Sequence, residues 1–264
     1  MTGRRTRLAL LALTPLLFLG GGADDPKAPP FEPTDRYEAR DVQGWTILVN
    51  KGLLTDQPEL AFEALDLLGH QLDQVIRKVP PEAVKRLRSV RIWLEEREPH
   101  HPCMAYHPDP SWLRDHGMNP EKARCVEVAN ARNFLEWIKV QPWMVFHELA
   151  HAYHHQALEG GFGNGDVRDA FRSASREKRY ESVLYADGRE KRAYAATNRM
   201  EYFAESSEAF FGSNDFYPFV RAELKQHDPE MEALLAKLWK VGSKARVDGA
   251  SKRAEMNPVT GPGR

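Results

Sequence analysis

The chain has 264 residues, 42% of them hydrophobic, and its 37 Lys and Arg side chains nearly balance 38 Asp and Glu, for a formal net charge of −1. This length is enough for one sizeable hydrophobic core. The even charge balance gives no electrostatic reason to expect nucleic acid or an anionic membrane as the main partner, which argues against both classes.

The first 23 residues have the layout of a secretory signal peptide. Arg4, Arg5 and Arg7 precede an apolar run from Leu8 to Leu19, and small residues follow it. The run is shorter than the roughly 20 apolar residues that a membrane-spanning helix needs. We therefore expect a secreted or periplasmic protein with no membrane span after signal removal.

Composition divides the rest of the chain into three parts. Residues 24–35 are proline-rich and predict an extended linker. Residues 36–241 carry the periodic apolar patterns and predict one folded domain. Residues 242–264 are polar, with almost no large apolar side chains, and predict a disordered tail.

The first part of the domain is predicted to contain two strands and a long helix between them. β-branched and aromatic residues predict strands at 42–49 and 90–94. Between them, apolar residues at helical spacing predict a helix that begins at Pro58 and ends at Pro80.

The middle of the domain is less regular. Residues 98–119 are rich in proline and histidine without a steady period and predict an irregular surface segment that borders a cleft. Residues 125–129 alternate polar and apolar side chains, which predicts a half-buried or edge strand. As an edge strand, it would be placed to bind an extended substrate by strand addition. Cys103 and Cys125 either form a disulfide after export or remain two separate buried thiols, and the sequence leaves this open. Their spacing does not favour a zinc site.

Residues 142–158 predict a helix with a proline near its start and glycines after its end. It contains the sequence H-E-L-A-H at residues 147–151. Because His147 and His151 lie one helical turn apart, both imidazoles can bind one zinc ion, and Glu148 stands beside them. Zinc lowers the pKa of a bound water to near 7, and Glu148 can accept the proton as general base.

A catalytic zinc usually has three protein ligands, so one more is required. His154 lies two turns from His147, too far along the helix axis for all three histidines to share one ion. We interpret His154 and His155 as solvated residues or residues near the ligands, with substrate contact as the alternative.

A second predicted helix, residues 198–211, offers three carboxylates on one face, those of Glu201, Glu205 and Glu208. A capping box with Asn198 is an alternative role for Glu201, and a solvated acidic face is the alternative for the other two. Before this helix, Asp166 is expected to cap a helix that ends near Lys178. After it, residues 215–241 predict one or two further helices.

The segment Y-A-A-T-N-R-M-E-Y-F-A-E at residues 194–205, together with the H-E-L-A-H helix, resembles the catalytic domain of the anthrax lethal factor family of gluzincin peptidases. The resemblance covers about 65 residues. It implies that Glu201 is the third zinc ligand and that Tyr194 stabilises the oxyanion or protonates the leaving group. It also implies that Glu205 lies near the metal or orients a ligand histidine.

Together these features predict an α+β, zincin-like fold, with a small mixed sheet, an active-site helix carrying H-E-x-x-H and a second glutamate-bearing helix. The predicted function is a secreted zinc metallopeptidase that hydrolyses peptide or protein substrates by metal-activated water. The alternatives are a secreted zinc-containing binding protein, a catalytically silent relative, or a hydrolase of another amide or ester. The substrate preference and the oligomeric state are not specified by the sequence.

Overall fold

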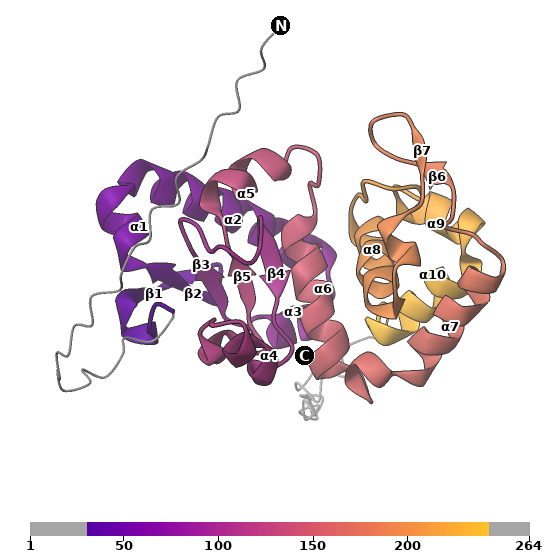
Figure 1. Cartoon of the computed structure of the whole chain (residues 1–264). Coiled ribbons are helices and arrows are strands. Elements are labelled where there is room, and N and C mark those ends of the chain that lie inside the picture. The colour runs from indigo at the N-terminus through magenta and orange to yellow at the C-terminus, as the bar shows by residue number, and fades with distance from the viewer. Residues whose placement is uncertain (1–30, 243–264) are drawn as a thin grey trace, which may run out of the picture.

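A computed structural model describes residues 31–242 of the chain (Figure 1). The predicted signal peptide, most of the predicted linker and nearly all of the predicted tail lie outside the described residues. The strands are β1 (Tyr37–Val42), β2 (Trp45–Asn50), β3 (Ile92–Leu94), β4 (Met104–Tyr106), β5 (Val126–Val128), β6 (Val183–Leu184) and β7 (Glu190–Lys191). The helices are α1 (Lys51–Asp56), α2 (Pro58–Lys78), α3 (Pro81–Leu87), α4 (Pro110–Asp115), α5 (Ala131–Trp137), α6 (Met144–Ala157), α7 (Gly165–Arg176), α8 (Arg199–Phe211), α9 (Arg221–His227) and α10 (Pro229–Leu238).

The larger sheet is mixed and has the strand order β1-β2-β3-β5-β4. Strands β2, β3 and β5 are parallel neighbours, whereas β1 and β4 pair antiparallel at the two edges. The predicted strand at 42–49 is wrong as one element, because a turn interrupts it. Gln43 and Gly44 have φ values of 57° and 83°, which suit a two-residue hairpin turn between β1 and β2. The α+β class with a small mixed sheet is confirmed.

The edge of the sheet differs from the sequence prediction. The predicted edge strand at 125–129 contains β5, which is an inner strand between β3 and β4. The edge strand is β4, which lies with α4 inside the segment predicted to be irregular, residues 98–119. Three-residue strands are too short to establish a period of two, so the pattern alone could not order them.

The predicted long helix is confirmed as α2, which buries Leu60, Ala64, Leu68, Leu72 and Val75 along one side. Helix α6 lies between the sheet and the C-terminal helices in Figure 1 and contacts both. It begins at Met144, two residues after the predicted start. Burial of apolar side chains on both sides makes α6 the central element of the core.

The helix that follows α6 has a different cap from the predicted one. Asn164, not Asp166, is the N-cap of α7, and its Oδ1 accepts a hydrogen bond from the backbone N–H of Val167 at 3.0 Å. The predicted helix at 198–211 is confirmed as α8, and α9 and α10 correspond to the helices predicted after it. No helix within residues 31–242 is both long and apolar enough to cross a membrane.

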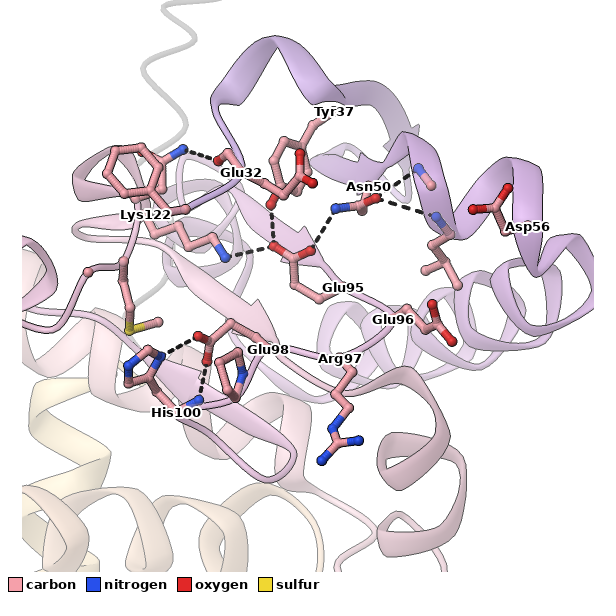
Figure 2. A pocket seen from close by; sticks show the side chains of 17 residues that line it. Glu32, Tyr37, Asn50, Asp56, Glu95, Glu96, Arg97, Glu98, His100 and Lys122 are labelled. Atoms are coloured by element: carbon pink, nitrogen blue, oxygen red, sulfur yellow. Dashed lines mark hydrogen bonds and ion pairs between the residues drawn. The ribbon is translucent and has the colours of Figure 1, made fainter. Parts of the chain in front are cut away.

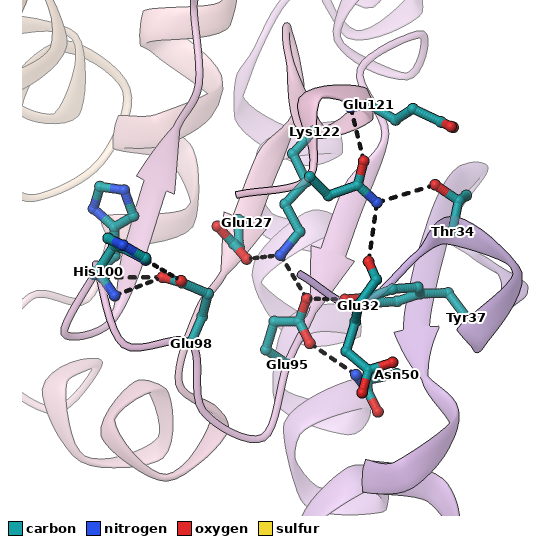
Figure 3. Close-up of polar contacts among 12 residues, drawn as sticks. Glu32, Thr34, Tyr37, Asn50, Glu95, Glu98, His100, Glu121, Lys122 and Glu127 are labelled. Carbon is teal, nitrogen blue, oxygen red and sulfur yellow. Dashed lines mark hydrogen bonds and ion pairs between the residues drawn. The ribbon is translucent and has the colours of Figure 1, made fainter. Parts of the chain in front are cut away.

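A buried polar group, here called the Lys122 cluster, crosses the sheet. It consists of Tyr37, Asn50, Glu95, His107, Lys122 and Glu127. The Lys122 amine donates to Glu95 Oε1 at 2.7 Å and to Glu127, as Figure 3 shows. The Tyr37 hydroxyl and the Asn50 amide also donate to Glu95, and His107 Nε2 lies 2.6 Å from Glu127 Oε2. Four members of the cluster, Tyr37, Asn50, Glu95 and Lys122, line a cavity of about 390 Å³ beyond the ends of β2 and β3, shown in Figure 2.

The two cysteines are not bonded to each other. Cys103 and Cys125 are free and buried, and they belong to different groups of core residues. Burial raises the pKa of the Cys103 thiol to about 12, so it stays protonated at neutral pH. The structure therefore agrees with the alternative of two separate buried thiols.

Candidate metal centre

Helices α6 and α8 pack against each other and bring His147, His151 and Glu201 together. The Nε2 atoms of the two histidines are 3.0 Å apart. Glu201 Oε2 lies 3.1 Å from Nε2 of His147 and 3.2 Å from Nε2 of His151. All three side chains are largely buried. The predicted ligands therefore converge on one point.

The three atoms have the spacing and chemistry of a zinc ligand set. A tetrahedral zinc with bonds of about 2.0–2.1 Å holds its ligand atoms about 3.3 Å apart, close to the distances between these three. Two imidazole nitrogens and a carboxylate oxygen that face one another in a buried site need a proton or a metal cation between them. The residues present fit zinc.

Asn198 has the predicted capping role, but Glu201 does not complete a capping box. Asn198 Oδ1 accepts hydrogen bonds from the backbone N–H groups of Met200 and Glu201. The Glu201 carboxylate instead points to the two histidines. Burial raises its pKa, but His147 and His151 outweigh that effect, and the net pKa is lowered. Glu201 is thus held as an anion.

The side chain that orients His147 is Glu208. Its Oε1 lies 2.6 Å from His147 Nδ1, whereas Glu205 Oε1 is 3.9 Å away. With Nδ1–H donating to Glu208, the lone pair of Nε2 is left to face the metal position. The resemblance implied that Glu205 lies near the metal or orients a ligand histidine. The structure assigns the orienting contact to Glu208, while Glu205 lines the same cleft as the candidate ligands. Glu205 and Glu208 lie on the predicted face of α8, but both side chains are buried rather than solvated.

A dense group of carboxylates lies behind His147. Burial, and then the neighbouring Glu208, raise the pKa of Glu205 well above its usual range. Burial also raises the pKa of Glu208, against the effect of His147, and it raises the pKa of Asp215. No sequence pattern indicates Asp215, because it lies outside the helical pattern that marked the glutamates.

A cleft of about 720 Å³ opens beside the candidate metal ligands. Glu148 and Tyr194 both line it, as do the two histidines and Glu201. Glu148 Oε2 accepts a hydrogen bond from the backbone N–H of Tyr106, on the edge strand β4, at 2.8 Å. Tyr194 is half exposed, and its ring centroid is 6.4 Å from that of His147. The structure therefore brings all five predicted site residues to one cleft.

Of the two remaining histidines of α6, His154 does not have the solvated surroundings that were one of its predicted alternatives. His154 is fully buried between Phe162 and Phe203, and neither of its ring nitrogens has a hydrogen-bond partner in the described chain. Burial lowers its pKa to about 3. His155 Nδ1 lies 2.8 Å from the Tyr106 hydroxyl. The prediction of a solvated His154 is wrong, because α8 covers that side of α6.

Comparison with known proteins adds little to this geometry. No protein-family model matches the chain, and no curated protein matches it. Among solved structures, the PRO-PRO endopeptidase (PPEP-2) from Paenibacillus alvei is similar, with a TM-score of 0.36 and 21% sequence identity. The match covers 63% of this chain and 86% of that one.

Proposed function

We propose that the chain is a secreted, zinc-dependent peptidase in which His147, His151 and Glu201 hold the metal. The convergence of two imidazole nitrogens and one carboxylate oxygen within 3.2 Å, at the wall of an open cleft, carries this proposal. A structural zinc site is usually closed by four protein ligands, whereas a catalytic site keeps a position open to the substrate. Export rests on the signal-peptide pattern of residues 1–23.

Glu148 has the position of a general base. When bound, zinc supplies a water of lowered pKa and polarises the substrate carbonyl. Glu148 lines the same cleft as the three ligands, and the Tyr106 N–H holds its carboxylate on the side of β4. Its carboxylate accepts the proton of the attacking water and delivers it to the amine that leaves.

Tyr194 provides a hydrogen-bond donor on the other side of the cleft. Partial burial, and then the charge of Glu201, raise the pKa of Tyr194. Its hydroxyl therefore stays protonated at neutral pH and can donate to the oxyanion that develops when water adds to the carbonyl. Its partial exposure leaves room for a substrate.

The edge strand β4 suits an extended peptide. Cys103 and His107 form backbone hydrogen bonds with residues in and next to β5. Because alternate residues of an antiparallel strand direct their N–H and C=O groups to opposite sides, Met104 directs its own to the free edge. Met104 also lines the cleft. Strand addition at β4 rather than at the predicted residues 125–129 would place a peptide across the metal position.

The test is a peptide-library digestion with the zinc-loaded chain and its Glu148→Gln variant, beside metal analysis of both. We expect both proteins to hold zinc and only the wild type to cleave. Glu159→Gln, an exposed glutamate just past α6, is the matched control and should cleave like the wild type. Cleavage by zinc-loaded Glu148→Gln would reject the role of Glu148, and absence of any cleavage by the zinc-loaded wild type would reject the peptidase function.

A further inference from the structure

A side cavity of about 110 Å³ extends from the cleft next to Glu148. It shares most of its lining with the cleft, including Met104, Glu148 and Asp215, so it is reached from the place where the scissile bond would lie. A water occupies about 30 Å³ in the liquid, so the cavity has room for three or four waters or for one long side chain. Its size and position are those of a pocket for a residue that flanks the scissile bond.

The lining of this side cavity combines two kinds of side chain. Met104, Trp137 and Met144 provide apolar surface. The carboxyl groups of Glu205, Glu208 and Asp215 provide acidic groups, beside His147 and Glu148 of the candidate site. A lysine or arginine side chain has the same two parts, an apolar stem and a cationic end.

The three carboxyl groups of the side cavity outnumber the basic groups in contact with them. Glu205, Glu208 and Asp215 are each about 5% exposed. Across residues 31–242, the one basic group in ion-pair contact with any of them is His147. Asp215 and Glu205 also accept hydrogen bonds from the neutral amides of Gln141 and Asn214, and Lys191 acts on Asp215 from a longer distance. Buried carboxylates without a cation are destabilised, so a cation that enters from the cleft gains the interaction that the fold leaves unmade.

We propose that the side cavity binds the cationic side chain of a lysine or arginine next to the scissile bond, so that the substrates are peptides with basic cleavage sites. The aliphatic stem packs between Met104, Trp137 and Met144, and the charged end reaches Asp215. Asp215 is the specificity-determining residue. This inference rests on the proposed peptidase function, because it takes the bond beside Glu148 to be the one that is cut.

The first test compares kcat/KM for peptides that carry lysine or norleucine at each position around the cleavage site. Norleucine has the lysine stem with a methyl group in place of the ammonium. We expect lysine to be preferred at one flanking position on the order of tenfold or more, since a hydrogen bond between charged groups is stronger than a neutral one. In Asp215→Asn this lysine-to-norleucine ratio should fall toward one. Asp73→Asn, on the exposed side of α2, changes the net charge equally and should keep the wild-type ratio.

The second test needs no turnover. Binding of N-acetyl-lysine amide and N-acetyl-norleucine amide to the zinc-loaded chain is measured by calorimetry, with zinc content and thermal midpoint confirming that Asp215→Asn is folded. We expect the lysine compound to bind more tightly and Asp215→Asn to remove the difference. Equal binding of the two compounds by the wild type would overturn the inference. Cleavage of peptides without any preference for basic residues would overturn it as well and leave the peptidase function standing, whereas charge-selective binding without cleavage would support the cavity and reject the function.

Discussion

Two groups of buried charged side chains in this protein differ in which cation their carboxylates contact. In the Lys122 cluster, one ammonium sits between Glu95 and Glu127, and neutral or histidine donors satisfy the remaining carboxylate oxygens. Around His147, two imidazole nitrogens and a glutamate oxygen face each other, and further carboxylates lie behind them.

This difference is why we interpret the Lys122 cluster as structural and the group around His147 as the proposed functional site. The Lys122 cluster supplies its own cation, so it links β1, β3, β5 and the turn at residues 120–122 without help. The group around His147 has an excess of acceptors and no lysine or arginine in ion-pair contact within the described chain. Such an arrangement is stable when a metal cation occupies it, and this is why we assign the function to the second group.

The largest expected effect comes from removing the cation of the Lys122 cluster. Lys122→Met leaves Glu95 and Glu127 buried without their partner and should lower the free energy of unfolding by about 3–5 kcal/mol. Lys85→Met, on the exposed side of α3, should change it by less than about 0.5 kcal/mol. Urea denaturation of both variants measures the difference. Equal losses of unfolding free energy in the two variants would show that the buried Lys122 contributes no more to stability than an exposed lysine.

A smaller effect is expected when the carboxylate behind a metal ligand is made neutral. Glu208→Gln should weaken zinc affinity by about 10–100-fold, because the amide orients His147 without a charge. Glu205→Gln, one turn away on α8 and 3.9 Å from the same nitrogen, should weaken it much less. Competition with a chromophoric chelator gives both affinities. A larger loss of zinc affinity in Glu205→Gln than in Glu208→Gln would show that Glu205 orients His147.

The free energy of unfolding should depend on pH through Glu127 of the Lys122 cluster. Burial raises the pKa of Glu127, but His107 and Lys122 outweigh it and the net pKa is lowered. This contribution is complete above the ordinary glutamate pKa of about 4.3, and it is lost as the pH falls below that value through the lowered pKa of the folded state. Each pKa unit by which folding lowers the pKa of Glu127 contributes about 1.4 kcal/mol to the free energy of unfolding.

Urea midpoints between pH 7 and pH 3 measure that contribution. Glu127→Gln should be less stable than the wild type at pH 7 and should lose less stability on acidification. A variant that follows the wild-type acid profile would show that Glu127 titrates with the same pKa in the folded and unfolded states.

The smallest effect is expected at His154, whose imidazole is buried with neither nitrogen bonded. Replacing a buried polar group that lacks partners by an apolar one of similar size removes a desolvation cost. His154→Leu should therefore keep the stability of the zinc-loaded chain or raise it by up to about 1 kcal/mol. Thermal unfolding measures the change, and a loss of more than about 2 kcal/mol would show that His154 makes a contact that the fold depends on.

Local patterns predicted the parts of the site that lie within single helices. The four-residue spacing of His147 and His151 and the helical spacing of Glu201 and Glu208 need only the helix period, and α6 and α8 have that period. The packing of α6 on α8 decides which carboxylate meets Nδ1 of His147, and no local pattern contains that information.

The parts that could not be predicted depend on contacts between distant segments. Strand β4 is three residues long, so its place at the sheet edge follows from pairing with β5 and not from its own sequence. Lys122 meets Glu95 across 27 positions of the chain. Its burial could not be expected from a residue type that is almost always exposed.

The most direct test of the metal centre is zinc binding at equilibrium by the wild-type chain and by Glu201→Ala, with X-ray absorption of the bound metal. We predict one zinc ion per wild-type chain, with two imidazole nitrogens and a carboxylate oxygen among its ligands, and a loss of most of the affinity in Glu201→Ala. An unchanged zinc affinity in Glu201→Ala, or a ligand shell that contains sulfur, would contradict the assignment of His147, His151 and Glu201.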